Sequence, residues 1–310
     1  MKKNNPTSVI VLILTAFIWG MAFVAQSEGG DAAGTFTFVC IRSVITSIFL
    51  SVLVAVLEKR PAGCGKPADR QQKKDLIVSG ILCGICLYFT SVFQQLGMQS
   101  GTPVGKAGFL TACYVVLVPV SGIFLGKRCE KKVWAAVAIT LAGLWLLCIK
   151  GDFSFRGSDF IVLGAAVMCA IQIHVIDAYI DRVNAVRMSQ VQFITSAVIG
   201  IIPMIIIEAV PAGIEAWGAP LLTRDAILPL LYTGFLSGGL GYTMQMIGQK
   251  GCEPAVASLL MSLESVFSVL AGWVLLNQQL SGRELIGCGL IFGAVVLSQL
   301  PQKTSVKESV

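Results

Sequence analysis

The sequence predicts an all-α membrane protein with ten transmembrane helices, arranged as two inverted five-helix repeats, with both termini cytoplasmic. Three observations lead to this fold class. The composition is strongly apolar, with a mean hydropathy of +0.80, 55% hydrophobic residues and only 13% charged residues, whereas about a quarter of the residues in soluble domains are charged. Long apolar stretches recur at short intervals, and the sequence matches itself at an offset of 151 residues.

The apolar stretches supply the helices of this fold. A helix needs roughly 20 mostly apolar residues to cross a bilayer. The ten stretches that approach or reach this length are 8–26, 34–57, 76–97, 103–125, 133–150, 158–180, 190–210, 226–247, 254–276 and 284–300. The links between them are too short to hold a soluble catalytic domain.

The internal repeat gives the arrangement of the helices. At an offset of 151 residues, without a gap, identical residues coincide at Gln94 and Gln245, Gly97 and Gly248, Pro103 and Pro254, Val115 and Val266, and Leu125 and Leu276. Because each half holds five stretches, an odd number, the second half enters the membrane from the opposite side. We therefore predict a first repeat in residues 1–152, an inverted repeat in 153–302 and a cytoplasmic tail in 303–310. Inverted repeats that meet at the midplane are a recurrent construction of secondary transporters.

The basic residues give the orientation. With ten spans and a cytoplasmic amino terminus, 17 of the 23 Lys and Arg residues fall in cytoplasmic segments and 4 in outer segments. The outer four are Lys150, Arg156, Arg224 and Arg283, and the two inside spans are Arg42 and Lys106. This asymmetry is the positive-inside signal. The basic residues then line one membrane face, where they meet anionic lipid headgroups. This explains the net charge of +6 without a nucleic-acid partner.

Cysteine and histidine do not indicate a cofactor. Most of the ten cysteines lie inside apolar stretches, where Cys behaves as a small apolar residue. Cys83 and Cys86 form a CxxC pair, but no second pair accompanies them. His174 is the only histidine. We therefore predict no metal and no cofactor.

Several short motifs indicate a family. The first stretch contains Ile18-Trp19-Gly20-Met21-Ala22-Phe23, the second Ile41-Arg42, the fourth begins Thr102-Pro103-Val104-Gly105-Lys106, and the fifth contains Leu141-Ala142-Gly143. These motifs resemble the EamA-like family of the drug/metabolite transporter superfamily, from about residue 8 to residue 300. The sequence departs from the family pattern in one respect. After the fourth and ninth spans the family often has Gly-Glu, whereas this sequence has Gly126-Lys127 and Asn277-Gln278.

The resemblance implies a carrier of the inner or plasma membrane. Such proteins move small organic solutes, often amino acids or related metabolites, by alternating access, and lipid-carrier flippases of the same superfamily are an alternative. The partners are then a small-molecule substrate, the bilayer and, as a coupling ion, the proton; the oligomeric state stays open. An enzyme is disfavoured by the single His and the lack of a ligand cluster. A sensor or assembly factor is disfavoured by the short loops.

Polar residues within the apolar stretches are candidates for the site, because a charge near the bilayer centre costs a few kcal/mol. Glu264 lies near the middle of its stretch and is the leading candidate for a substrate or proton ligand; the alternative is a protonated Glu that bonds a backbone carbonyl. His174 has Asp177 one turn further along the same helix face. A His beside a carboxylate suits a proton carrier, and the alternative is a structural hydrogen bond between helices.

Three further residues complete the candidate set. Lys106 lies in the first turn of its helix, where the positive end of the helix dipole disfavours a cation. An anionic substrate group bound by Lys106 would relieve this conflict, so the substrate is predicted to carry a carboxylate, with an amino acid as the leading case; the alternative is snorkelling to the outer interface. Arg42 either snorkels or faces a cavity. Trp19 either packs between helices or forms an aromatic cavity wall. By resemblance, Trp19, Lys106, His174 and Glu264 lie near a central site.

Overall fold

The computed structural model describes residues 5–59, 64–127, 129–149, 155–276 and 279–300, and all regular elements in these ranges are helices. The first half holds α1 (Pro6–Ala33), α2 (Thr35–Leu57), α3 (Arg70–Gln99), α4 (Val104–Ala112), α5 (Tyr114–Phe124) and α6 (Lys131–Cys148). The second half begins with α7 (Gly157–Tyr179), α8 (Ala185–Pro203), the π-helix η1 (Met204–Ala209), α9 (Val210–Ala212) and α10 (Ile214–Leu221). It continues with α11 (Arg224–Leu231), the π-helix η2 (Tyr232–Gly241), α12 (Tyr242–Lys250), α13 (Pro254–Met261), α14 (Leu263–Leu276) and α15 (Gly282–Gln299).

Each of the ten predicted stretches coincides with a helical segment over the residues that the structure describes. Eight of these segments are long and apolar enough to cross a membrane. The other two predicted spans lie on α1, in which the described residues include the shorter apolar stretch Pro6–Ala22, and on the continuous segment α11–η2–α12. The predicted limits are short by several residues at α1 and α3, because both helices extend beyond their apolar parts. The proposed tail 303–310 and the junction between the halves at 152 and 153 lie outside the described residues.

Two π-helices interrupt the second half. The segment η1 directly follows Pro203, and η2 begins three residues after Pro229. Proline has no N–H to donate within a helix and its ring crowds the preceding turn. A wider π-turn accommodates such a disruption, and π-turns often occur at functional sites. Pro203 and Pro229 therefore coincide with a change of helix type in these two spans.

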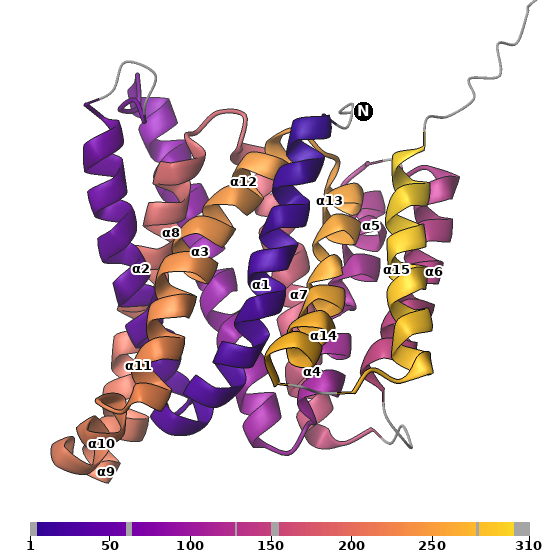
Figure 1. Cartoon of the computed structure of the whole chain (residues 1–310). Helices are drawn as coiled ribbons and strands as arrows, with labels where there is room; N and C mark the ends of the chain where they lie inside the picture. The colour runs from indigo at the N-terminus through magenta and orange to yellow at the C-terminus, as the bar shows by residue number, and fades with distance from the viewer. Residues whose placement is uncertain (1–4, 60–63, 128, 150–154, 277–278, 301–310) are drawn as a thin grey trace, which may run out of the picture.

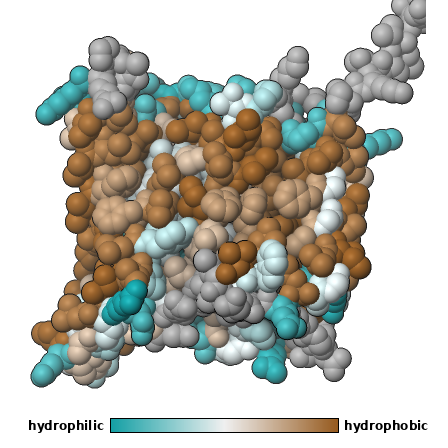
Figure 2. All heavy atoms as spheres, in the orientation of Figure 1, coloured by the Kyte–Doolittle hydropathy of each residue, from teal (hydrophilic) through white to brown (hydrophobic). Residues whose placement is uncertain are grey.

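The helices run alternately between two faces of the molecule (Figure 1). One face, which we call the N-terminal face, holds the start of α1, where Asn5 N–H donates to Gly251 O over 3.0 Å. The end of α15 lies on the same face (Figure 1), beside the start of α6, where Lys132 Nζ donates to Leu300 O over 2.8 Å. The opposite face carries α9 and α10. On the side of the molecule that Figure 2 shows, an apolar belt lies between hydrophilic rims at these two faces, as expected of a protein surrounded by lipid.

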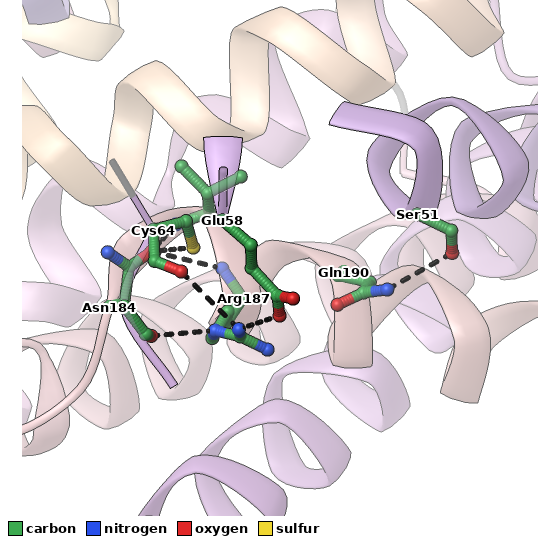
Figure 3. Close-up of polar contacts among 8 residues, drawn as sticks. Ser51, Glu58, Cys64, Asn184, Arg187 and Gln190 are labelled. Carbon is green, nitrogen blue, oxygen red and sulfur yellow. Dashed lines mark hydrogen bonds and ion pairs between the residues drawn. The ribbon is translucent and has the colours of Figure 1, made fainter. Parts of the chain in front are cut away.

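Helices α2 and α8 pack together and are joined at both ends. At the N-terminal face, Glu58, which ends α2, forms an ion pair with Arg187 in the first turn of α8 (Figure 3). Arg187 Nε also donates to Gly65 O over 2.9 Å, and Gln190 donates to Ser51 over 3.1 Å.

The opposite end has an analogous link. Glu208 of η1 accepts hydrogen bonds from the backbone N–H groups of Phe36 (3.0 Å) and Thr37 (2.6 Å). These N–H groups lie in the first turn of α2, where the backbone donors of a helix have no acceptor within the helix itself. At one end, therefore, a carboxylate that follows α2 binds a side chain in the first turn of α8. At the other end, a carboxylate that follows α8 accepts from backbone donors in the first turn of α2, so the two helices form a linked pair.

In the remaining packing, corresponding helices of the two halves make corresponding contacts, each with the opposite half. Helix α3 packs against α7 and α8, while α11–η2–α12 packs against α1 and α2. Helices α4 and α5 contact α7, while α13 and α14 contact α1. Helices α6 and α15 pack against each other, and a Cβ atom on Gly143 would lie only 2.8 Å from Gly287 O. The largest buried apolar cluster gathers around α5, α6, α7, α13 and α15.

Candidate functional site

A cavity lies in the centre of the helix bundle. Its walls come from both halves and include Trp19, Gln26, Arg42, Thr90, Ser91, Gln94, Thr111, Tyr114, Cys169, Gln172, Ile173, Ser237, Tyr242, Gln245, Met261 and Glu264. Most of these side chains are polar, although they lie within apolar helices. Three of the six predicted site residues, Trp19, Arg42 and Glu264, meet here.

Arg42 supplies the positive charge of this cavity. It is the eighth residue of α2, and its guanidinium donates to Gln26 Oε1 over 3.3 Å and to Ser91 Oγ over 2.5 Å. The Phe38 ring lies 5.8 Å from the guanidinium carbon. These partners are neutral, and Arg42 forms no ion pair within the described residues. Because an arginine guanidinium has five N–H donors, these two hydrogen bonds leave further donors available.

Glu264 supplies the negative charge. Its side chain is 8% exposed and forms no ion pair within the part of the chain that the structure describes. The carboxyl lies close to the hydroxyl of Tyr114. Both residues follow a local irregularity: α4 gives way to α5 at Cys113, and α13 to α14 at Ser262. The fourth predicted span of each half, α4–α5 in the first and α13–α14 in the second, thus brings Tyr114 and Glu264 to one cavity.

Trp19 forms the wall between α1 and η2. Its indole Nε1–H donates to Ser237 O over 3.3 Å, and its ring lies 4.7 Å from that of Tyr242. A Cβ atom on Gly241 would lie 2.7 Å from the same indole nitrogen, so the close approach requires glycine there. On the α2 side, Thr46 donates to Gly234 O over 2.7 Å. Trp19 is therefore both a cavity wall and a packing contact, which combines the two alternatives.

His174 and Asp177 line a second cavity. This cavity, which we call the vestibule, lies toward the N-terminal face. His174 Nε2 is 2.8 Å from Ser121 Oγ and 3.1 Å from Val118 O, while Asp177 forms an ion pair with Lys127. The structure therefore does not bring His174 into the central cavity with Glu264.

Lys106 lies outside both cavities. Its ammonium is 2.5 Å from Asp159 Oδ2, and Asp159 also accepts from Thr102 Oγ1 (2.9 Å) and Arg156 N–H (2.7 Å). Asp159 is fully buried, and Lys106 is 11% exposed. The dipole conflict at Lys106 is thus relieved by an anion, but this anion belongs to the protein. Neither a substrate group nor snorkelling is needed to explain the residue.

Sequence reasoning did not select several residues of the central cavity. Gln94 and Gln245 both line it, and they are the pair of identical residues at the repeat offset of 151. Gln245 is 2% exposed, and its Oε1 has no hydrogen-bond partner within the described ranges, as is also true of the Tyr114 hydroxyl. A repeated polar residue within an apolar stretch was the available signal. Among the residues the structure describes, no three His, Cys, Asp or Glu side chains converge as metal ligands would.

Comparison with known proteins identifies the family. The model of the EamA-like transporter family matches residues 6–149 and again residues 156–300, so the chain belongs to this family. It is 24% identical over 290 residues to an uncharacterized transporter of Archaeoglobus fulgidus, covering 93% of this chain and 84% of that protein. It is 26% identical over 163 residues to a probable terminal-alkyne amino-acid exporter of Streptantibioticus cattleyicolor, covering 52% of each.

The fold has a solved counterpart. A crystal structure that covers 95% of this chain and 98% of its own superimposes with a TM-score of 0.76 at 20% identity, which establishes a shared fold. The protein is therefore a multi-pass membrane transporter that acts on a small-molecule substrate, and it is not an enzyme.

Proposed function

We propose that this protein is an alternating-access secondary transporter whose central cavity binds a small solute carrying both a carboxylate and an ammonium group, with an amino acid as the leading case. One observation carries the proposal. Arg42 and Glu264 line the same cavity, and neither has an oppositely charged protein partner within the described residues. Unpaired charges in a membrane interior are costly, and a zwitterionic ligand would neutralise both.

The remaining polar groups give such a ligand an orientation. Arg42 has donors available for a carboxylate, which a guanidinium can bind in a bidentate manner. Glu264 is the acceptor for the ammonium group, and Gln245 Oε1 provides a second acceptor. The anion-binding role that the sequence assigned to Lys106 is therefore transferred to Arg42. The partial similarity to a probable terminal-alkyne amino-acid exporter supports this substrate class.

We further propose ten membrane spans in two inverted repeats, residues 1–152 and 153–302, with cytoplasmic termini. The exchange of packing roles between the halves supports this arrangement, as do the two separate family matches. The junctions between α2 and α3, α5 and α6, and α7 and α8, with the adjoining helix starts, carry 10 of the 16 described basic residues and lie on the N-terminal face, which supports a cytoplasmic location. A periplasm-active reporter fused to the carboxyl terminus should give no signal, and strong activity would exclude the ten-span scheme.

The substrate class is tested by binding to purified protein. Amino acids should raise the melting temperature, because a ligand that binds only the native state stabilises it by mass action. Their methyl esters lack the carboxylate charge and their N-acetyl derivatives lack the ammonium, so both should bind more weakly. Equal binding of all three forms would contradict the zwitterion site. Stabilisation by polyprenyl phosphates alone would favour a lipid-carrier flippase.

Proton coupling has a separate test. Glu264 in the central cavity and His174 in the vestibule are the two candidates for a coupling proton. In Glu264→Gln, uptake driven by a pH gradient should fall while exchange of bound solute persists, since the amide keeps the shape but not the proton. His174→Asn tests the second candidate in the same way. Unchanged pH-driven uptake in both variants would exclude a proton-coupling role for either residue.

A further inference from the structure

The segment between α8 and α11 leaves the helix bundle at the face opposite the N-terminal face. Helices α8, η1 and α9 form one continuous run, Ala185–Ala212, and at about 1.5 Å per residue its 28 residues span roughly 40 Å. The hydrocarbon core of a bilayer is only about 30 Å thick. The end of this run, the turn at Gly213 (φ 81°) and α10 therefore reach the level of the lipid headgroups, at the corner of the molecule where Figure 1 shows α9 and α10.

Hydrogen bonds to α2 place the same segment at this level independently. Trp217 Nε1–H donates to Thr37 Oγ1 over 2.8 Å, and Glu208 accepts from the backbone N–H groups of Phe36 and Thr37. These groups lie in the first turn of α2, at one end of the apolar stretch 34–57. Tryptophan is enriched at the membrane interface, because its ring is apolar while its N–H needs a polar partner.

The segment exposes large apolar side chains that the bundle does not cover. Val210 is 70% exposed, Ile214 82% and Leu222 80%. They flank the part of α10 that is attached to the bundle, where Trp217 bonds α2 and Leu221 packs beside a buried apolar cluster. Because the removal of apolar surface from water is favourable in proportion to its area, three such side chains in one short segment favour an environment other than water.

The apolar belt of the molecule indicates what covers these side chains. Ile202 and Ile206, earlier in the same run, are each 63% exposed, as expected of side chains that face lipid. In Figure 2, apolar surface continues to the lower left corner, where Figure 1 places α9 and α10 in the same orientation. Between Val210 and Leu222 the sequence holds one charged residue, Glu215. Since anionic headgroups would repel a carboxylate, the attraction to lipid is apolar and not electrostatic.

We propose that residues 210–222 form an interfacial anchor, in which Val210, Ile214 and Leu222 insert at the boundary between the headgroups and the acyl chains of the adjacent lipid leaflet. Interfacial helices bury their apolar side chains about 5–10 Å into this boundary. Because Trp217 is bonded to the first turn of α2, the anchor holds the linked pair α2 and α8 at a fixed depth. This leaflet is the outer one in the topology proposed above, whereas the insertion itself does not depend on that topology.

The test measures the depth of single positions in full-length protein reconstituted in lipid nanodiscs. A bimane fluorophore is attached to Ile214→Cys or Leu222→Cys, and the wild type is labelled in parallel to subtract the signal of its native cysteines. Phosphatidylcholine with a nitroxide near the headgroup should quench both labels more strongly than phosphatidylcholine with a nitroxide near the end of an acyl chain. Ile48→Cys, in the middle of α2 and 61% exposed, should show the opposite order.

Two outcomes of this measurement would overturn the proposal. Lys66→Cys, in an exposed loop of the N-terminal face, provides the reference for a label in water. Both anchor labels should emit at shorter wavelength than this reference, and emission and iodide quenching equal to the reference would show that the segment lies in water. Short-wavelength emission that neither lipid quenches would show that a second copy of the chain covers the segment instead of lipid.

A charge substitution separates insertion from mere attachment to the bundle. The side chain of Ile214 is largely exposed, so Ile214→Asp should leave the fold intact and lower the quenching of Leu222→Cys by the headgroup nitroxide, because a carboxylate favours water. Glu215→Gln, at the neighbouring exposed position, is the matched control and should not lower it. Unchanged quenching in Ile214→Asp would contradict an anchor of inserted apolar side chains. No substrate is present, so failure of amino acids to bind would contradict only the central zwitterion site.

Discussion

The Lys106–Asp159 pair and the central cavity each bring a positive and a negative side chain into the helix bundle, and they differ in what neutralises the charges. Near the face opposite the N-terminal one, Lys106 and Asp159 lie 2.5 Å apart, and Thr102 and Arg156 N–H satisfy the remaining acceptors. In the central cavity, Arg42 and Glu264 line one space, but each lacks an oppositely charged partner within the described residues.

The difference separates structural charges from charges available to a ligand. A buried ion pair with complete hydrogen bonds is self-sufficient, and removal of one member leaves an uncompensated charge. Charges that face a cavity without such a partner can be neutralised by whatever enters it. The position of a charge within a span therefore does not reveal its role, whereas its partner does.

The largest expected effect is on stability at the structural pair. Lys106→Met should destabilise the protein by roughly 3 kcal/mol, since it leaves the fully buried Asp159 without its counter-ion. Chemical denaturation of purified protein in detergent measures this change, and the substrate dissociation constant should stay the same. Lys131→Met is the matched control, because Lys131 is an exposed lysine in the first turn of α6. Weaker substrate binding with unchanged stability would return Lys106 to the substrate site.

A smaller effect is expected on binding at the central cavity. Arg42→Gln should weaken binding of an amino-acid substrate by roughly 10- to 150-fold, since a charge-assisted contact is worth about 1.5–3 kcal/mol. The same variant should bind the amino acid and its methyl ester nearly equally, which separates loss of the carboxylate contact from general damage. The exposed Arg224 provides the control variant, Arg224→Gln. Retained preference for the free carboxylate in Arg42→Gln would show that another residue binds it.

The wall of the central cavity should be moderately sensitive to added volume. Gly241→Ala places a methyl group 2.7 Å from the Trp19 indole nitrogen, and such overpacking costs about 1–3 kcal/mol. We expect a lower melting temperature together with weaker substrate binding, because both Trp19 and Tyr242 form the cavity wall. Gly289→Ala, on an open surface of α15, should not destabilise the protein. Equal behaviour of the two variants would argue against a tight contact between η2 and Trp19.

The smallest effect is expected at Glu253. Its raised pKa means that the folded state holds the proton more tightly than the unfolded chain does. The contribution of Glu253 to stability is therefore most favourable below about pH 4.5, and it declines as the pH rises through the raised pKa. Glu253→Gln should accordingly be more stable than the wild type at pH 7, by less than about 1 kcal/mol, and equal to it near pH 4. Thermal unfolding at both pH values measures this, and a less stable variant at pH 7 would contradict the expectation.

The sequence by itself determined the class of the protein and the course of its helices. Apolar stretches of bilayer length, as at α2 and α3, must become helices, because lipid offers no hydrogen bonds to an exposed backbone. This constraint is local, so the ten stretches could be located without knowledge of their neighbours. The motifs around Trp19 and Arg42 were sufficient to indicate the EamA-like family. The same local reasoning found Glu264, because a carboxyl deep in an apolar helix stands out.

Only the tertiary structure decided which charges meet. Lys106 and Asp159 are 53 residues apart, and nothing in the pattern of either helix indicates that they form a pair. His174 and Glu264 are both single titratable groups within spans, yet α7 and α13–α14 direct them to different cavities. The π-helix η2 and the contact of Gly241 with Trp19 likewise depend on how α1 packs against the second half. The identity of a charged residue is a property of the sequence, whereas its counter-charge is a property of the folded chain, and the counter-charge determines the role.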